Sequence, residues 1–330
     1  MSATQTILVA TCGQGIMRSA DHGESWTRLP IYQDIEYDDI VRTLHVHPTQ
    51  QNVIYAGFQC GIAKTEDAGR TWKRLSSFLD SYALWKIAID PKNPDNIYVG
   101  TGAPTRAIAA RSQDGGKTFE RLPLAFPERC AGVSKPRLLA MAVDPEEPNN
   151  VWCGAEEGGL FHSEDFGASW NRVDTNIPGQ PLMHTDIHDI VVIPGKPKRV
   201  AVSTVVALHI SEDNGRTWTR TMAKDAFGFR YSRNVAYLAD DARTLLYACA
   251  DATPGTHGFV YRSENNSAWA KSDLDTKTCP WAFGINSSDP KRVLVGTKFG
   301  ELYESEDAGR TFRKHWREFS EICAVAWVAA

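Results

Sequence analysis

Short apolar runs separated by polar turns alternate along the whole chain of 330 residues. Seven of these runs are rich in Val, Ile and Tyr, a composition that is typical of β-strands. They cover residues 6–12, 52–58, 96–102, 150–156, 199–205, 244–250 and 292–298. A second apolar run precedes most of them and often ends in a Pro turn, and another such run occupies residues 321–328. The pattern predicts an all-β fold.

A polar phrase recurs between the apolar runs, with the form Ser/Thr-x-Asp-x-Gly-x-Ser/Thr-Trp/Phe. Its copies start at Ser19, Thr65, Ser112, Ser163, Ser211, Ser263 and Ser305. The central positions of the copies are Asp21, Asp67, Asp114, Asp165, Asp213, Asn265 and Asp307. These positions lie 42 to 52 residues apart, and a period of this length indicates a propeller or a linear array of repeats.

Each phrase predicts a β-hairpin turn that is stapled by its acidic side chain. The Asp carboxylate can accept hydrogen bonds from nearby backbone N–H groups, and the Gly two residues later allows a positive φ. The final Trp or Phe is expected to fill a buried slot, because burying an aromatic ring removes roughly 150–250 Å² from water. In the sixth copy Asn265 and Ser267 replace the Asp and the Gly, so we expect that turn to be the loosest.

The phrase resembles the Asp-box, or BNR repeat, of sialidases and sialidase-like propellers. This resemblance covers nearly the whole chain and implies a seven-bladed β-propeller. It also implies that each box lies on the turn between the third and fourth strands of a blade, away from the usual active site. Seven blades of about 45 residues fill residues 1–330 as a single domain. We expect the run at 321–328 to pair with the run at 6–12 and to close the ring.

Composition argues against several classes of function. A net charge of −4 does not favour a broad nucleic-acid surface, and no apolar stretch approaches the ~20 residues of a membrane span. The N-terminus lacks the basic and apolar segments of a signal peptide. The sequence has seven cysteines, which is an odd number, and no CxxC motif, so we expect reduced thiols and a cytoplasmic location. No nucleic-acid or membrane partner is predicted, and the oligomeric state stays open.

Candidate functional residues are expected on two kinds of loop. In a four-stranded blade the first strand lines the central channel. The loops that lead into first strands meet, at the channel mouth, the loops that join second and third strands. Repeat proteins keep their specificity on loops of this kind. Two of these loops, 102–110 and 250–258, are longer than the others.

The segment 184–188 places two histidines and an aspartate at alternating positions. If the segment is a strand, its two-residue period puts all three side chains on one side, where they can form part of a divalent-metal site. The alternative is that polar residues of a loop simply face water. The candidate metal ligands are His184, His188, His257 and Glu156, with Asp186 and Glu157 nearby in the pattern. A divalent cation is therefore the cofactor that the sequence suggests.

Basic residues also gather on the predicted mouth loops. Arginine holds carboxylate or phosphate groups through a two-pronged contact, so this set predicts a small anionic ligand. The alternative is that several of the cations are structural and are paired with acidic side chains. The candidate substrate-binding residues are Arg42, Lys86, Arg106, Arg137, Arg230, Arg233 and Lys298, together with Trp281.

Tyr231 lies between two of these arginines. The sialidase resemblance implies a Tyr nucleophile activated by a carboxylate, which makes Tyr231 a catalytic candidate and a sialidase-type glycosidase an alternative function. However, the triplets at 28–30 and 121–123, which are similar to the Arg-Ile-Pro motif of sialidases, follow the boxes on predicted outer strands. The arginine triad of that family is not recognisable, and sialidases typically have six blades.

A further histidine pair, His45 and His47, also alternates. His47 aligns with Asp90 and Asp144 of other repeats, each directly before a Pro. This alignment predicts a structural role for His47 in a turn.

The sequence therefore favours an enzyme, a hydrolase or lyase that acts on a small anionic molecule at the channel mouth. In this hypothesis His184 or His188 is the general base or a metal ligand, Asp186 orients it, and the basic residues stabilise developing negative charge. With a bound cation, a metal-bound water would replace the base. The alternative is a non-catalytic propeller that binds a protein or peptide, similar to the Asp-box assembly factors of photosynthetic membranes and to sortilin-type receptors.

Overall fold

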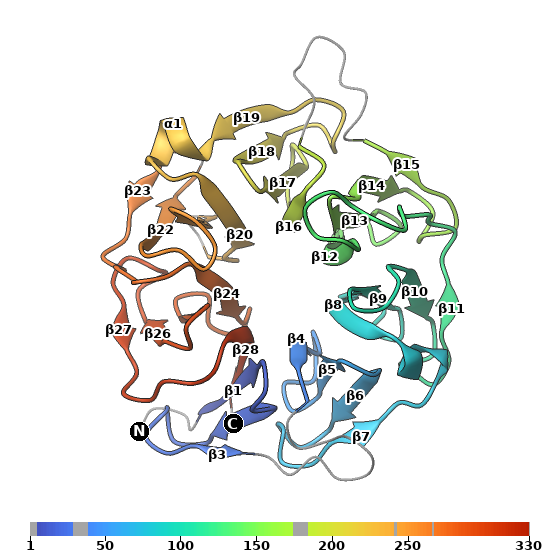
Figure 1. Cartoon of the computed structure of the whole chain (residues 1–330), viewed down its shortest axis with the longest axis horizontal. Coiled ribbons are helices and arrows are strands. Elements are labelled where there is room, and N and C mark those ends of the chain that lie inside the picture. The colour runs from blue at the N-terminus through green and yellow to red at the C-terminus, as the bar shows by residue number, and fades with distance from the viewer. Residues whose placement is uncertain (1–4, 29–38, 174–183, 241–242, 266, 330) are drawn as a thin grey trace. The chain divides into compact units, whose positions relative to one another are not determined.

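The computed structural model describes residues 5–28, 39–173, 184–240, 243–265 and 267–329 (Figure 1). Almost all of the regular structure in these residues is β-strand. The helices among them are short: α1 (Ala223–Phe227) and the 3-10 helix η1 (Phe78–Ser81). The chain divides into two compact units, which we call unit 1 (Met1–Leu75 with Ala236–Ala330) and unit 2 (Ser76–Val235). The prediction of a nearly all-β fold is confirmed.

The described residues of unit 2 form three antiparallel meanders in which each strand is hydrogen-bonded to the next strand along the chain. The first consists of β8 (Ala83–Ile89), β9 (Ile97–Gly102), β10 (Ala109–Ser112) and β11 (Glu120–Arg121). The second consists of β12 (Arg137–Val143), β13 (Val151–Glu156), β14 (Gly159–Ser163) and β15 (Asn171–Arg172). The third consists of β16 (Ile187–Ile193), β17 (Arg199–Thr204), β18 (Ala207–Ser211) and β19 (Thr219–Met222). The division between the units falls inside β20 (Tyr231–Tyr237).

Unit 1 contains further meanders of the same kind. They are β4 (Val41–Val46), β5 (Ile54–Phe58), β6 (Ile62–Thr65) and β7 (Lys73–Arg74); β21 (Leu245–Ala250), β22 (Gly258–Ser263) and β23 (Ala270–Lys271); and β24 (Pro280–Ile285), β25 (Val293–Thr297), β26 (Leu302–Ser305) and β27 (Arg313–Lys314). Another sheet joins β1 (Gln5–Thr11), β2 (Ile16–Ser19) and β3 (Thr27–Arg28) to β28 (Ile322–Ala329).

The two terminal strands lie side by side in unit 1, as the sequence predicts. In Figure 1 β28 runs next to β1, and the pairing is antiparallel with Ile7 opposite Trp327 and Val9 opposite Val325. All four of these side chains are buried. The number of blades and the closure of a ring stay predictions.

Among the strand pairs that the structure describes, six strands have a β-bulge near their N-terminal ends. We call β4, β8, β12, β16, β24 and β28 the leading strands, since each carries an extra residue where it pairs with its neighbour in the sheet. In each, one extra residue stands opposite the neighbouring strand. The extra residues are Arg42, Trp85, His188, Trp281 and Cys323, and in β12 Leu138 and Leu139 together oppose Ala155. A bulge re-aims one side chain and often lies beside a functional site.

The strands themselves form a dry core in each unit. In unit 2 Trp152 of β13 packs with Trp218, Leu160 and Val200, all of which are buried. Such alternating layers of large apolar side chains leave the sheets rigid, so the loops and bulges at their ends are held in fixed positions.

The repeated turns are stapled as the sequence predicts. In the first copy Asp21 Oδ1 accepts a hydrogen bond from the backbone N–H of Ser25 at 2.9 Å, and Ser19 Oγ accepts one from the N–H of Gly23 at 2.8 Å. The same pair of contacts recurs in the copies at Asp67, Asp114, Asp165, Asp213 and Asp307. The hydroxyl and N–H of Ser25 lower the pKa of Asp21 to about 2, so the staple is a carboxylate. Gly23 adopts a φ of 86°, which a side chain would resist.

The prediction for the closing aromatic residue is wrong in part. Trp72 and Trp218 are buried, but the other described aromatic residues at this position are only half-buried. The indole N–H does not account for the difference, because Trp218 donates to Gly215 O at 3.1 Å and is buried, whereas Phe119 and Phe312 have no such donor and are half-buried. In the first copy Trp26 Nε1 donates to Gly23 O at 3.0 Å, and Trp170 Nε1 donates to Gly167 O at 2.9 Å, so the ring lies across its own turn.

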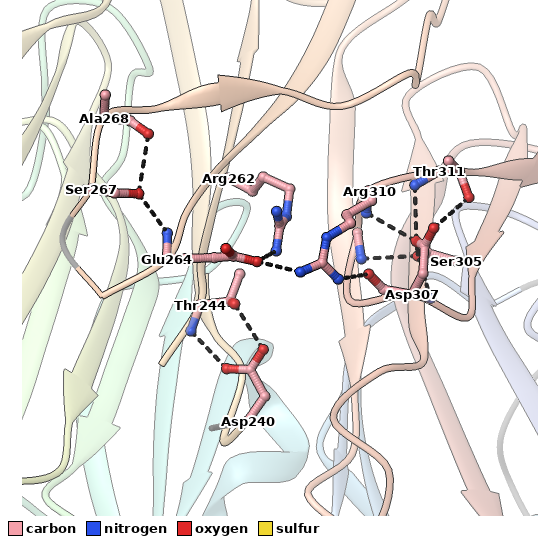
Figure 2. A network of polar contacts seen from close by, with 11 residues as sticks. Asp240, Thr244, Arg262, Glu264, Ser267, Ala268, Ser305, Asp307, Arg310 and Thr311 are labelled. Atoms are coloured by element: carbon pink, nitrogen blue, oxygen red, sulfur yellow. Dashed lines mark hydrogen bonds and ion pairs between the residues drawn. The ribbon is translucent and has the colours of Figure 1, made fainter. Parts of the chain in front are cut away.

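Figure 2 shows the sixth and seventh copies of the turn side by side. In the seventh, Asp307 accepts from the N–H of Thr311 at 2.9 Å and from its hydroxyl at 2.7 Å. In the sixth no carboxylate is available at this position, and the Glu264 N–H instead donates to Ser267 Oγ at 3.3 Å. Arg310 of the seventh turn forms an ion pair with Glu264 of the sixth. Asn266 lies outside the described residues, so the expected looseness of the sixth turn stays a prediction.

Candidate functional site

The ends of β12, β13, β16 and β20 in unit 2 bring polar side chains together. We call the group Arg137, Glu156, Asp186, His188, Tyr231 and Arg233 the unit 2 polar cluster. Arg137 opens β12, Glu156 ends β13, Asp186 directly precedes β16, His188 is the bulged residue of β16, and Tyr231 and Arg233 lie at the start of β20. The strand ends and the bulge therefore place these residues in one region.

His188 is the most buried member of the cluster, with 2% of its surface exposed. Its Nδ1 lies 2.6 Å from the carbonyl oxygen of Ser232. A carbonyl oxygen can only accept, so Nδ1 carries a hydrogen. The second ring nitrogen, Nε2, faces Asp186 Oδ1 at 3.3 Å, and the Tyr231 ring lies 5.2 Å from the imidazole, centroid to centroid. The hydrogen bond to Ser232 thus fixes both the tautomer and the direction of Nε2.

Two buried carboxylates meet at this imidazole. Donor atoms of Glu156, Asp186 and His188 all lie within 4.8 Å of one another. Burial raises the pKa of Asp186, but the contact with His188 and the charges of His184 and Arg233 outweigh burial and hold the pKa below its usual value. Asp186 is therefore ionised at neutral pH. Among the described residues this is the group whose side chains suit a metal ion.

Arg137 connects the cluster to an aromatic surface. Its guanidinium forms an ion pair with Glu156 and lies over the Trp85 ring at 5.0 Å from the centroid. The Trp85 indole donates to Ala103 O at 2.8 Å, which fixes the ring. Gly102 allows the close approach, because a Cβ there would come within 2.5 Å of Arg137 Cα. Arg137 is thus shared between a carboxylate and a half-buried indole.

Several of the predicted anion-binding cations are already paired with carboxylates. In unit 2 Lys86 Nζ lies 3.1 Å from Asp189 Oδ1, and Asn234 donates to the other oxygen of Asp189 at 3.1 Å. Arg106 forms an ion pair with the exposed Glu128. These contacts match the alternative that the sequence left open, in which the basic residues are structural.

The remaining predicted residues of unit 2 are less involved. The strand begins at Ile187, so the premise that 184–188 is a regular strand is wrong. The bulge at His188 also breaks the expected alternation. His184 is exposed, and its Nδ1 accepts the backbone N–H of Asp186 at 3.1 Å. Arg230 is exposed. Neither His184 nor Arg230 is among the buried groups that meet at His188.

Unit 1 holds the other predicted residues. Lys298 Nζ lies 4.1 Å from the centre of the Trp281 ring and forms an ion pair with Glu321. Arg42 donates to Gln59 Oε1 at 3.0 Å. His257 is exposed in a loop, with Nδ1 3.0 Å from Thr256 Oγ1. It is not part of the group formed by Glu156, Asp186 and His188.

Sequence reasoning missed Asp189 and Asn234, which complete the contacts of Lys86. Asp189 directly follows the bulged residue of β16, and a bulge is visible only when residues are counted against the partner strand. It also missed Cys323, the bulged residue of β28, whose thiol pKa is raised to about 12 by burial and by the charge of Glu321.

No helix in the described part of the chain is long and apolar enough to cross a membrane. All seven cysteines are free thiols, and Cys153, Cys249 and Cys279 are buried. Burial raises the pKa of the Cys153 and Cys249 thiols, so these two are held as neutral apolar groups.

No family model matches the chain. An oligoxyloglucan-reducing end-specific xyloglucanase of Emericella nidulans is 22% identical over 329 residues, which cover 84% of this chain and 40% of that protein. The photosystem II assembly lipoprotein Ycf48 of a Synechococcus species is 27% identical over 183 residues, which cover 54% of this chain and 49% of that protein. The chain thus spans only about 40% of the length of the xyloglucanases that it matches.

Solved structures show the same two kinds of neighbour. The GH74 enzyme of Niastella koreensis superposes with a TM-score of 0.65 at 20% identity, over 83% of this chain and 45% of that chain. YCF48 of Cyanidioschyzon merolae superposes with a TM-score of 0.61 at 17% identity, over 90% of each chain. Both are propeller-type proteins, so the fold of this chain is of the propeller type. Membership of the Asp-box family stays a prediction.

Proposed function

We propose that this chain is a hydrolase that acts on a polysaccharide of the xyloglucan type at the unit 2 polar cluster. The observation that carries the proposal is the pair of buried carboxylates, Glu156 and Asp186, in a chain that is similar to xyloglucanases over more than four fifths of its length. A neutral polysaccharide takes the place of the small anionic substrate predicted from the basic residues, because Lys86 and Arg137 are neutralised by carboxylates.

Glycoside hydrolysis uses two carboxyl groups, roughly 5–5.5 Å apart when the reaction retains configuration. The carboxylates of Glu156 and Asp186 each offer an oxygen within 4.8 Å of the other. Asp186 would supply the ionised group, since its pKa is held below the usual value. Its charge suits the positive sugar ring that develops in the transition state.

Glu156 would supply the proton to the leaving group. In this structure Glu156 forms an ion pair with Arg137, so Arg137 has to leave before Glu156 can act as an acid. Trp85 offers a reason for that movement: Arg137 covers its ring, and a sugar that stacks on the indole would displace the guanidinium. Substrate binding and protonation of Glu156 are coupled in this proposal.

The proposal also includes the fold of the chain. We infer a single seven-bladed propeller of Asp-box repeats, closed by the β1–β28 pair. The stapled turns at six aspartates, the antiparallel meanders and the terminal pairing support it. A cytoplasmic location is also only proposed, and the free thiols favour it.

The test is an assay of reducing-end release from xyloglucan and from its oligosaccharides. Glu156→Gln and Asp186→Asn should each lower kcat by 100-fold or more, on the order of the loss of an acid–base group. Trp85→Ala should mainly raise KM. Glu128→Gln, which removes an exposed partner of Arg106, is the matched control and should keep full activity. Equal rates for wild type and Asp186→Asn would overturn the proposal.

A second candidate function is a scaffold that binds a protein or peptide. The observation that supports it is the likeness to YCF48 of Cyanidioschyzon merolae, which superposes over 90% of each chain. Calorimetric titration with xyloglucan oligosaccharides separates the two. The absence of both binding and turnover would favour the scaffold, and turnover that depends on Asp186 would exclude it as the sole function.

A further inference from the structure

We propose that Glu156, Asp186 and His188 form a binding site for a divalent transition-metal cation, with zinc as the best match. The proposal uses residues of the proposed hydrolytic site but does not depend on hydrolysis. It rests on the distance between the donor atoms, on the orientation of the imidazole, and on two buried oxygens that lack hydrogen bonds.

The distance between His188 and Asp186 is that of two ligands of one ion. Zinc bonds to imidazole nitrogen and to carboxylate oxygen are about 2.0–2.1 Å long and close to tetrahedral, which places the two donor atoms roughly 3.3–3.4 Å apart. His188 Nε2 and Asp186 Oδ1 are 3.3 Å apart. The Glu156 oxygen, within 4.8 Å of both, can complete the set by rotating its carboxylate toward them.

The imidazole is held as metal-bound imidazoles are held. A ligating histidine usually donates its other ring N–H to a carbonyl or carboxylate, which fixes the tautomer and the ring orientation. His188 Nδ1 donates to Ser232 O at 2.6 Å. Ser232 is itself fixed, because its hydroxyl lies 2.7 Å from that of Ser203. The nitrogen aimed at the carboxylates is therefore the one with a lone pair.

Two buried carboxylate oxygens have capacity to bind a cation. Asp186 Oδ1 and Glu156 Oε2 are buried, and neither makes a hydrogen bond of acceptable geometry. Asp186 Oδ1 lies 3.3 Å from His188 Nε2, and Glu156 forms an ion pair with Arg137, but neither contact has the alignment of a hydrogen bond. Buried polar atoms nearly always have a hydrogen-bond partner or a metal. A cation between the three side chains would satisfy both oxygens and the imidazole lone pair at once.

Arginine is the competitor for this site. The negative charges of the two carboxylates are offset by two arginines. Arg137 forms an ion pair with Glu156, and the charge of Arg233 lowers the pKa of Asp186. A divalent cation must therefore displace Arg137 from Glu156. The side chain of Arg137 is 28% exposed, so it can turn toward water. Metal binding is expected to be weakened by this exchange and to strengthen when Arg137 is removed.

The experiment uses the full-length chain stripped of metal by a chelator and titrated with ZnCl₂ by calorimetry. We expect one equivalent to bind. Asp186→Asn and Glu156→Gln should each weaken binding by about 100-fold, since loss of even a supporting partner of a metal ligand costs 10–100-fold. Arg137→Gln should strengthen it about tenfold, because the competing charge is gone. Titration with CoCl₂ adds a visible spectrum, and a four-coordinate ion should give an intense band.

Asp189→Asn is the matched control. It is the same isosteric change three residues further along the chain, inside β16, and the carboxylate of Asp189 already contacts Lys86 and Asn234. This variant should bind zinc as the wild type does. Circular dichroism of each variant verifies folding, which matters because His188 is buried.

Three results would overturn the metal site: no zinc bound by the wild type, equal binding by Asp186→Asn, or no change in Arg137→Gln. The proposed hydrolase fails separately. Zinc binding without xyloglucan turnover would leave the metal site standing and remove the hydrolase. Turnover that persists in the chelated protein, with no zinc bound, would do the reverse.

Discussion

Among the described residues two buried histidines face a carboxylate, one in each unit, and their surroundings differ. In unit 1 His315 Nε2 lies 3.1 Å from Glu304 Oε2, and Glu304 also accepts from Arg292 Nε at 2.6 Å and from Arg313 Nη2 at 3.1 Å. In unit 2 Asp186 Oδ1 faces His188 at 3.3 Å and makes no hydrogen bond of good geometry. The first carboxylate is fully occupied, and the second has capacity left for a ligand.

This difference separates a structural charge network from a candidate site. Burial raises the pKa of Glu304, but the hydrogen bonds from His315 and Arg292 outweigh it and lower the pKa to about 2. The network joins three strands of one sheet, since Arg292 directly precedes β25, Glu304 lies in β26 and His315 directly follows β27. A carboxylate with all its partners in place stabilises the fold and has no role left in binding.

The largest expected effect follows from breaking the occupied pair. Glu304→Gln removes a charge whose partner Arg292 has a side chain only 10% exposed. Removing one partner of a buried ion pair costs about 3–5 kcal/mol of unfolding free energy, which urea denaturation measures. Glu306→Gln is the control, because Glu306 also contacts Arg292 but is 75% exposed, and it should cost less than about 1 kcal/mol. Equal losses in the two variants would contradict this interpretation.

The second prediction concerns how the stability contributed by Glu304 depends on pH. The pKa of Glu304 is depressed from an ordinary value of 4.5 to about 2. A carboxylate whose pKa is depressed by folding stabilises the folded state above pH 4.5, and this stabilisation is lost as the pH falls from about 4.5 toward 2. The size is on the order of 3 kcal/mol.

Urea denaturation at a series of pH values checks this window by comparing wild type with Glu304→Gln. The stapling carboxylates, such as Asp21 and Asp114, are shifted in the same direction and remain in both proteins. The difference between the two curves therefore isolates Glu304. It should shrink toward zero at low pH, and curves that stay parallel down to pH 2 would show that Glu304 is not the group that titrates.

The turns and strands of this protein were predictable because their signals are local. A Ser, an Asp and a Gly at fixed spacing form the staple within one turn, as at Asp21. The alignment of His47 with Asp90 and Asp144 is also confirmed. His47 Nδ1 accepts the N–H of Gln50 at 3.1 Å, and Asp90 Oδ1 accepts that of Asn93 at the same distance.

The polar pairs were predictable only in part, because their partners come from different strands. His188 was a candidate from an alternating pattern, yet a bulge and not the strand period aims its side chain. Nothing in the sequence links Arg292 to Glu304 and His315 before the sheet forms. Whether a basic residue binds a ligand or neutralises a carboxylate, as Arg137 does with Glu156, is likewise decided by tertiary structure.

The smallest effect comes from the less occupied pair. Asp186→Asn should change the unfolding free energy of the metal-free protein by about 1 kcal/mol or less. Its Oδ1 makes no hydrogen bond to lose, and a neutral hydrogen bond is worth about 1 kcal/mol in any case.

The measurement is the same urea denaturation, at neutral pH and with chelator present. In a second series, zinc replaces the chelator. The wild type should then gain unfolding free energy and Asp186→Asn should not, because a ligand stabilises only the folded state that binds it. A loss in Asp186→Asn as large as that in Glu304→Gln would mean that both histidine–carboxylate pairs are structural. Asp186 would then have no capacity left for a ligand, and the difference between the two units would disappear.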